Sequence, residues 1–271
     1  MYVNEGGTWK LVLQPYIKDA GNWKPVQRLW VKEAGVWKED LQAINLTISA
    51  DTTNYNIKTA ALATGWSGST PVRVTVTIDS GIYVSATTTS GYAMDTGTSW
   101  PTNSIISIVN NGFIVGRGGA GGHGENSGGG GRTNGSTGGN ALNLQYAAFI
   151  TNNGVIAGGG NGGDGGSQRS TSTVVNQETV TTSYAGGGGG GGRSGRTDST
   201  GGSPGSGGDY GGIAGAAGTV SGGGIGGYYN ASTSPAQRAA SGTEWGVSSS
   251  YIVGNSFATW LATGTTYGAA S

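Results

Sequence analysis

Glycine constrains this chain more than any other residue type. Of its 271 residues 58 are glycine. Most of these lie between Gly116 and Gly227, including an unbroken run from Gly186 to Gly192. A glycine within a regular helix or strand costs roughly 0.5–1 kcal/mol relative to alanine, so the block predicts neither element. Two alternatives remain: a disordered linker, or polyproline-II-type helices of glycine (polyglycine II) whose backbones pack where only glycine fits.

The residues around and between the glycine runs favour the ordered alternative. The runs alternate with varied polar inserts that carry tyrosine and arginine, and two apolar segments, Ile105–Val115 and Tyr251–Tyr267, bracket the block. A flexible linker has no physical need for such residues. The sequence therefore predicts a glycine-rich polyglycine-II domain with variable inserts over residues 116–250.

Composition excludes several classes of protein. The chain has 14 lysines and arginines against 14 aspartates and glutamates, whereas a nucleic-acid-binding protein shows a basic excess. It has no cysteine, so neither disulfides nor a cysteine-based zinc site can form. No run of about 18 apolar residues predicts membrane insertion. The first residues also lack the basic and then apolar pattern of a signal peptide.

The first 42 residues contain a three-fold repeat with a period of 14. Each unit reads aromatic, β-branched, polar, acidic, small, Gly, any residue, Trp, Lys. This order predicts a short strand, a glycine turn and a second strand, and three such hairpins can bury area that one hairpin cannot. The repeat is either a purely structural β module or a docking module for a larger assembly. The candidate attachment residues are Trp9, Trp23, Trp30 and Trp37.

Residues 43–115 are predicted to form a β domain. Val72–Ile78 alternates between apolar and polar residues, as a half-buried strand does. An Asn-Asn-Gly step occurs at residues 110–112 and again at residues 152–154, 42 residues later, each time between apolar segments. Because Asn and Gly both accept positive φ, each step predicts the tight turn of a hairpin that leads into a glycine run.

Two further segments complete the β prediction. Ala141–Tyr146 is a strand candidate, and residues 251–271 are expected to form a closing strand with a turn at Gly254 and Asn255. The predicted fold class is all-β, with a polyglycine-II helix sandwich, N-terminal β-hairpin repeats and no substantial α-helix.

Motifs for catalysis are weak. Residues 116–121 fit the dinucleotide fingerprint G-x-G-x-x-G, but such matches arise by chance in a glycine-rich chain and no βαβ context follows. Residues 201–205 fit G-x-S-x-G, but a proline directly after the serine prevents the required turn into a helix. His123 is interpreted as a surface or packing residue, and nothing fixes the separation of a carboxylate pair such as Asp198 and Asp209 for glycan hydrolysis. We therefore expect no catalytic residues, no metal and no cofactor.

The glycine-rich part of the chain resembles a known family. Its Asn-Asn-Gly steps into glycine runs, its variable inserts and its closing motif from Ile252 to Thr265 are similar to those of receptor-binding adhesins of tailed bacteriophages, in particular the tail-fibre-tip adhesins of T-even-like phages. The resemblance covers residues 105–267, and the first 42 residues differ from the attachment domain of those adhesins. It implies a sandwich of polyglycine-II helices whose distal loops contact a host outer-membrane protein or surface glycan.

The inserts are the expected receptor-binding elements, because recognition usually sits on loops of a rigid scaffold. The longest are Ser167–Tyr184, Arg193–Thr200 and Tyr228–Trp245. They carry the aromatic and arginine residues that dominate binding hot spots. The candidate receptor-binding residues are Tyr184, Arg193, Arg196, Tyr228, Tyr229, Arg238 and Trp245.

The expected function is that of a non-enzymatic adhesin at the tip of a phage tail or tail fibre, made in the host cytoplasm. The N-terminal repeats are expected to bind other phage tail or fibre proteins, and the inserts a bacterial surface receptor. Neither nucleic acid nor membrane insertion is expected, and the oligomeric state is left open. The alternative is a purely structural tail or fibre component without receptor binding. Ice binding is disfavoured, because the irregular inserts break the strict Gly-x-x period of ice-binding polyglycine helices.

Overall fold

The computed structural model describes residues 2–11, 16–25, 28–33, 35–126, 130–167, 169–175, 178–184 and 249–271. Strands dominate these residues, and the one α-helix among them is the seven-residue α1 (Ile57–Ala63). The all-β prediction without substantial α-helix is therefore confirmed.

The strands of the central body wind into a three-sided parallel β-solenoid, in which each of five rungs supplies one strand to each of three sheets. The first sheet contains β6 (Val36–Ile48), β9 (Val72–Ile78), β12 (Ile105–Asn110), β15 (Ala148–Asn152) and β20 (Ala258–Ala262). The second contains β7 (Thr52–Thr53), β10 (Tyr83–Ser85), β13 (Phe113–Val115), β16 (Val155–Ala157) and β21 (Thr265–Tyr267). The third contains β8 (Tyr55–Asn56), β11 (Met94–Asp95), β14 (Leu142–Asn143), β19 (Ser250–Val253) and β22 (Ala269–Ala270).

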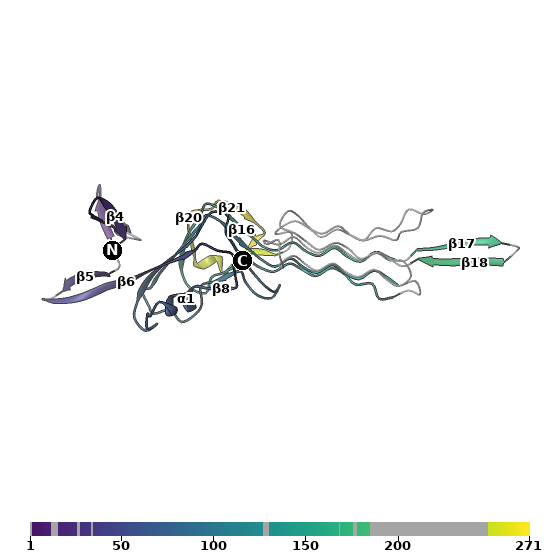
Figure 1. Ribbon diagram of the computed structural model, residues 1–271, viewed down its shortest axis with the longest axis horizontal. Coiled ribbons are helices and arrows are strands. Elements are labelled where there is room, and N and C mark those ends of the chain that lie inside the picture. Colours follow the sequence, from purple (N-terminus) through teal and green to yellow (C-terminus); the bar gives the residue numbers. More distant parts are fainter. Residues whose placement is uncertain are drawn as a thin grey trace.

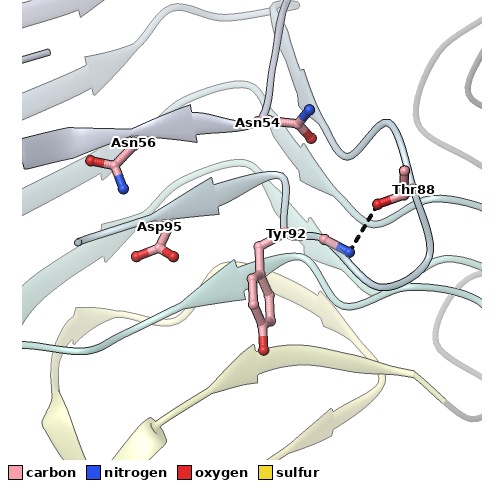
Figure 2. A pocket seen from close by; sticks show the side chains of 6 residues that line it. Asn54, Asn56, Thr88, Tyr92 and Asp95 are labelled. Carbon is pink, nitrogen blue, oxygen red and sulfur yellow. Dashed lines mark hydrogen bonds between the residues drawn. The ribbon is translucent and has the colours of Figure 1, made fainter. Parts of the chain in front are cut away.

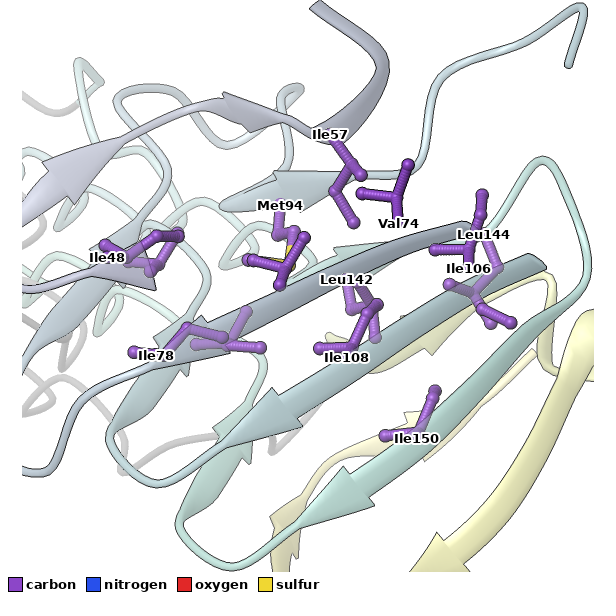
Figure 3. Packing of buried hydrophobic residues seen from close by; sticks show 14 of the residues in the cluster. Ile48, Ile57, Val74, Ile78, Met94, Ile106, Ile108, Leu142, Leu144 and Ile150 are labelled. Carbon is purple, nitrogen blue, oxygen red and sulfur yellow. The ribbon is translucent and has the colours of Figure 1, made fainter. Parts of the chain in front are cut away.

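The hydrophobic core fills the inside of the solenoid (Figure 3). Along β9, every second residue from Val72 to Ile78 is fully buried, as the predicted alternation requires. The parallel pairing is in register, so equivalent side chains stack from rung to rung. Val76, Ile108 and Ile150 form one such column. Each buried side chain of this size contributes about 1.5–3 kcal/mol, so the stacked columns stabilise the body.

Buried asparagines close the corner between the first and second sheets. Asn110 Nδ2 donates to Asn152 Oδ1 over 2.8 Å and to the Val155 carbonyl oxygen over 3.1 Å. Asn152 Nδ2 donates in turn to the carbonyl oxygens of Thr263 and Thr265 on the last rung. Both asparagines are buried. This ladder therefore links three successive rungs by side-chain hydrogen bonds.

Two expectations about the Asn-Asn-Gly steps are wrong. β12 and β13 lie in different sheets and pair in parallel with β15 and β16 of the next rung, so the turn between them is a solenoid corner and not a hairpin. None of the residues in either step has positive φ. Gly112 is required for a different reason: a Cβ there would lie 2.3 Å from the Ile82 carbonyl oxygen of the preceding rung.

Three insertions leave the solenoid at the corner between the second and third sheets. They span residues 86–93 after β10, 116–141 after β13 and 158–249 after β16. Because they leave from one corner of successive rungs, the glycine-rich segments start side by side and extend away from the solenoid together (Figure 1). The chain thus passes repeatedly from a β base into glycine segments and back, as the sequence indicates.

Three glycine-rich segments form a bundle held by main-chain hydrogen bonds. The amides of residues 116–125 donate to carbonyl oxygens of residues 157–166. The amides of residues 159–165 donate to carbonyl oxygens of residues 133–139, and the amides of residues 133–139 donate to carbonyl oxygens of residues 117–123. In each set the bonds recur at every third residue, which is the period of a polyproline-II-type helix. One set joins the amides of Gly116, Gly119, Gly122 and Glu125 to the carbonyl oxygens of Ala157, Gly160, Gly163 and Gly166.

Glycine recurs in the bundle because neighbouring backbones leave no room for a side chain. A Cβ at Gly119 would lie 2.0 Å from the Ser136 carbonyl oxygen, and one at Gly162 would lie 1.9 Å from the Ala120 carbonyl oxygen. The expected polyglycine-II sandwich also includes residues 185–248, which lie outside the described residues. The sandwich as a whole therefore stays a prediction.

Polar side chains complete the hydrogen bonds of the bundle. Asn161 Oδ1 and Asp164 Oδ1 accept from the amides of Gly138 and Gly135, each over 2.9 Å. The Ser136 hydroxyl accepts from an amide of the first segment over 2.7 Å. These side chains stabilise the bundle through bonds to its backbone.

The N-terminal repeats form three antiparallel hairpins, as predicted. β1 (Tyr2–Glu5) pairs with β2 (Thr8–Leu11), β3 (Tyr16–Asp19) with β4 (Asn22–Pro25), and β5 (Arg28–Glu33) with the first part of β6. The turn glycines have positive φ, which favours glycine: 83° at Gly7, 86° at Gly21 and 85° at Gly35.

β6 continues from the third hairpin into the solenoid, where residues 42–48 pair with β9. The predicted boundary between residues 42 and 43 thus lies inside one strand. Residues 142–157 carry β14, β15 and β16 of the solenoid. The division into segments 1–42, 43–115, 116–250 and 251–271 stays a prediction.

Smaller differences have local causes. The strand candidate Ala141–Tyr146 is shortened to the two residues of β14. The helix α1, which the sequence analysis did not anticipate, begins where Asn56 Oδ1 accepts from the Thr59 amide over 2.9 Å. The predicted turn at Gly254 is confirmed, with φ of 76°.

Replacing Asn152 by alanine is expected to destabilise the solenoid by about 2–3 kcal/mol, because buried donors and acceptors on two rungs lose their partner. Denaturant unfolding monitored by circular dichroism measures the change. The neighbouring Asn153 is exposed and bonds Asn111 Oδ1, so Asn153→Ala is the matched control and should cost less than about 0.5 kcal/mol. Equal effects of the two substitutions would contradict the role of the ladder.

Replacing Gly162 by alanine is expected to disrupt the glycine bundle, because the added Cβ collides with backbone that cannot rotate away. The cost should exceed the roughly 1–3 kcal/mol typical of overpacking, and the amides of residues 116–139 should lose protection from hydrogen exchange. The adjacent Asn161→Ala removes the side-chain hydrogen bond to the Gly138 amide without adding a group to the packed backbones, and it should cost about 1 kcal/mol. Unchanged protection in the Gly162 variant would show that the backbones are not packed this closely.

Candidate functional site

A hairpin projects from the end of the glycine bundle that lies farthest from the solenoid (Figure 1). It consists of β17 (Arg169–Val175) and β18 (Glu178–Tyr184), which pair antiparallel over their full length. At about 3.1 Å per residue, residues 116–125 of the bundle span roughly 31 Å. The strands of seven residues add roughly 24 Å at about 3.4 Å per residue. The hairpin tip is therefore held well clear of the solenoid.

The hairpin presents hydroxyl-bearing residues along both strands. Serine and threonine face each other across it, as in the pairs Thr171 with Thr182 and Ser172 with Thr181. No other strand among the described residues pairs with its outer edges. A two-stranded sheet of this kind offers main-chain donors and acceptors along both edges, which is the geometry that strand addition uses.

One predicted receptor-binding residue, Tyr184, lies at the base of this hairpin, where its backbone pairs with Arg169. The hairpin occupies the predicted insert Ser167–Tyr184, but the sequence analysis treated that insert as a loop. Its β-branched threonines and valines on either side of an Asn-Gln step were the signal for two strands. The other candidates lie outside the described residues and stay predictions: Arg193, Arg196, Tyr228, Tyr229, Arg238 and Trp245.

The candidate attachment residues lie at the opposite end of the molecule (Figure 1). The backbone places three of the tryptophans at equivalent positions of the three hairpins, where Asn4 pairs with Trp9, Lys18 with Trp23 and Lys32 with Trp37. Trp30 occupies the position of the aromatic residues that open the other two repeats, and it pairs with Glu39.

The second hairpin is the one whose side chains are described, and it is open to solvent. Trp23 is 67% exposed, and Tyr16 and Ile17 on the facing strand are 58% and 59% exposed. The Lys18 ammonium lies 5.9 Å from the centroid of the Trp23 ring. An isolated two-stranded hairpin is marginally stable in water, so this exposed apolar surface is suited to binding a partner.

Of the residues considered for catalysis, those that the structure describes are built into the scaffold, whereas Asp198, Asp209 and residues 201–205 lie outside the described residues. Residues 116–121 belong to the glycine bundle. The His123 carbonyl oxygen accepts from the Thr133 amide, and the His123 amide donates to the Thr133 hydroxyl. Asp164 accepts from a bundle amide, as described above. Burial raises the pKa of the Tyr55 phenol, so this group stays neutral.

Searches for other kinds of site were confined to the part of the chain that the structure describes. There, no group of three or more His, Cys, Asp or Glu side chains is placed to hold a metal ion. Within the same residues, no helix has the length and apolar character needed to cross a membrane.

Comparison with known proteins agrees with this architecture. Nothing among the curated proteins matches the sequence. Among solved structures, a chain in the crystal structure of the gp37-gp38 adhesin tip complex of the bacteriophage S16 long tail fiber shares the fold, with a TM-score of 0.56 and 21% identity over 85% of this chain and 83% of that chain. The family described as phage tail fibre adhesin Gp38 matches residues 43–271. The protein therefore belongs to the Gp38 family of phage tail fibre adhesins, as its sequence resemblance predicted.

Proposed function

We propose that this adhesin recognises a host cell-surface receptor, an outer-membrane protein or a surface glycan, through the elements at the far end of the glycine bundle. The observation that carries the proposal is the placement of the hairpin β17–β18 at the end of a bundle closed by main-chain hydrogen bonds. Main-chain hydrogen bonds hold the bundle together, so the side chains at its far end are not needed for its stability. The hairpin and the inserts with Arg193, Tyr228 and Trp245 are thus free to specify the receptor.

The flanks of the bundle are poorer candidates for the receptor site. Asn161, Asp164 and Ser136 already use acceptor atoms for bundle amides. A receptor that engaged these atoms would have to replace hydrogen bonds that stabilise the scaffold. Among the described residues, no strand pairs with the outer edges of the hairpin, so a receptor strand could add main-chain hydrogen bonds there.

The N-terminal hairpins are proposed to attach the protein to another phage tail or fibre protein. The exposed Tyr16 and Trp23 of the second hairpin lie at the end opposite the proposed receptor-binding end, as attachment requires. The family match begins at residue 43, so the hairpins lie outside it. The S16 structure named above contains gp38 in complex with gp37, and an equivalent fibre protein is the proposed partner here. The protein acts in the virion as a binding protein without enzymatic activity, and it is made in the host cytoplasm.

Shortening the distal hairpin tests receptor binding. Replacing residues 170–183 by two glycines should reduce adsorption of the purified protein to host cells about ten- to a hundredfold, the effect of losing a binding hot spot. The thermal midpoint should change little, because the solenoid and bundle remain. Thr137 and Asn134 are exposed on the bundle, so their double alanine variant is the control and should adsorb normally. Unchanged adsorption of the shortened protein would favour the purely structural alternative, or a receptor site on another element.

Substituting the hairpin tryptophans tests attachment. The double variant Trp9→Ala and Trp23→Ala should lower incorporation into phage particles at least about tenfold, the effect of a lost aromatic anchor. Adsorption of the isolated protein should be unaffected. Leu261 is 53% exposed on the last rung, so Leu261→Ala is the control for loss of exposed apolar surface. Normal incorporation of the double variant, measured by immunoblotting of purified particles, would rule out attachment through these tryptophans.

A further inference from the structure

A polar pocket opens on the third sheet of the solenoid, away from both ends of the molecule. It has a volume of about 240 Å³ and is lined by Asn54, Asn56, Thr88, Gly91, Tyr92 and Asp95. Asn56 and Asp95 come from β8 and β11, Asn54 lies between β7 and β8, and the others belong to the short insertion at residues 86–93 (Figure 2). The pocket therefore lies between two rungs, beside the corner from which the glycine segments leave.

Hydrogen bonds within the protein hold the walls of this pocket. The Asn54 side chain bonds Thr87 twice, with Nδ2 donating to the hydroxyl over 2.6 Å and Oδ1 accepting from the amide over 3.0 Å. Asn54 also has a φ of 49°, a left-handed conformation that is uncommon outside glycine. The Thr88 hydroxyl accepts from the Gly91 amide over 3.1 Å, a bond within the insertion that closes its turn.

Asn56 and Asp95 provide a paired donor and acceptor on the floor of the pocket. They are direct neighbours on the parallel strands β8 and β11. Asn56 Oδ1 accepts from the Thr59 amide of the helix α1, so the donor that Asn56 contributes to the pocket is its Nδ2 group. The Asp95 carboxylate is held by the Gly97 amide at Oδ1 over 2.6 Å and by Asn143 Nδ2 at Oδ2 over 3.1 Å. Because a carboxylate accepts about four hydrogen bonds, Asp95 retains acceptor capacity.

From this geometry we propose that the pocket binds one sugar residue of a bacterial surface glycan. An amide donor beside a carboxylate acceptor matches two neighbouring hydroxyl groups of a pyranose, each of which both donates and accepts a hydrogen bond. The half-buried ring of Tyr92 at the edge of the pocket supplies the apolar surface that the C–H face of a sugar ring requires. The site is distinct from the distal receptor-binding end.

Other ligand classes fit the pocket less well. The Asp95 carboxylate repels phosphate and other anions. The nearby Lys58 ammonium offers no compensation, because it donates to the carbonyl oxygens of Thr98 and Ser99 over 2.9 Å and 2.6 Å. A purely apolar ligand would leave the amide of Asn56 and the carboxylate of Asp95 without hydrogen-bond partners beneath it. The volume is below the roughly 300–1,000 Å³ of pockets that enclose drug-sized ligands, so a single sugar unit is the appropriate size.

The position of the pocket on the solenoid would let glycan binding strengthen adsorption to the host cell, and this step rests on the proposed function. When the distal end contacts the host surface, the solenoid stands off by at least the roughly 31 Å of the bundle. Surface polysaccharides extend outward from the cell over such distances. A weak glycan site on the solenoid would then add to the distal contact by raising its effective concentration.

Saturation-transfer NMR of the full-length protein tests the site. The probe is the oligosaccharide released from the lipopolysaccharide of a strain to which the protein adsorbs. Tyr92→Ala and Asp95→Asn should each weaken binding at least about tenfold, with thermal midpoints near that of the original protein. The control is Tyr267→Ala, because Tyr267 is a 45% exposed tyrosine on the last rung. Its binding should stay within twofold.

The shortened hairpin variant separates this site from the distal one, and it should bind the oligosaccharide as the original protein does. The proposal is overturned if the original protein gives no saturation transfer to the oligosaccharide, or if transfer survives both pocket substitutions. It is equally overturned if shortening the hairpin abolishes transfer, since the glycan would then bind at the distal end. None of these results depends on whether the distal end binds a protein receptor.

Discussion

Main-chain hydrogen bonding between chain segments that lie side by side is the interaction on which this structure depends. In the solenoid it joins each rung to the next in parallel register, and in the glycine bundle it joins three extended segments at every third residue. Both arrangements bring backbones so close that a Cβ cannot fit at particular positions, such as Gly112 at a corner and Gly119 in the bundle. The abundance of glycine is therefore a consequence of backbone packing.

The two halves use this interaction for different purposes. The solenoid adds columns of buried isoleucine and valine and the ladder of Asn110 and Asn152, so side chains determine its register. The three described segments of the bundle consist mainly of glycine and polar residues, and they are joined by main-chain hydrogen bonds and by side chains such as Asn161 that bond the backbone. Sequence between the bundle segments is consequently free to change, because it carries little of the stability. This freedom suits inserts that must match a receptor.

Much of the fold could be predicted from local patterns. Alternation in Val72–Ile78 identified a buried strand, the 14-residue repeat identified three hairpins, and Gly254 identified a turn. The direction of strand pairing could not be predicted, because alternation is the same in parallel and antiparallel sheets. For this reason the sequence analysis predicted hairpins at the Asn-Asn-Gly steps. The strands that pair across them are separated by insertions such as residues 158–249, and no local signal spans that distance.

The candidate sites show the same limit. The tryptophans of the N-terminal repeat could be found because they recur in sequence, and the structure places Trp9, Trp23 and Trp37 at equivalent positions. The pocket with Asn56 and Asp95 could not be found, because these residues meet only through the register of two rungs. Single polar residues in short strands carry no periodic signal. Functional residues that recur within a local repeat can thus be predicted from the sequence. Residues that come together from different rungs can be identified only once the solenoid structure is known.

The arrangement along the long axis places the proposed attachment hairpins and the proposed receptor-binding hairpin at opposite ends. The hairpins at one end and β17–β18 at the other are joined only through the solenoid and the bundle (Figure 1). The family match covers residues 43–271 and excludes the hairpins, although β6 runs unbroken from the third hairpin into the first rung. A continuous strand can join a hairpin to a solenoid because both need the same extended backbone at this point. The proposed attachment hairpins thus join the solenoid through the continuous strand β6, far from the proposed receptor-binding hairpin.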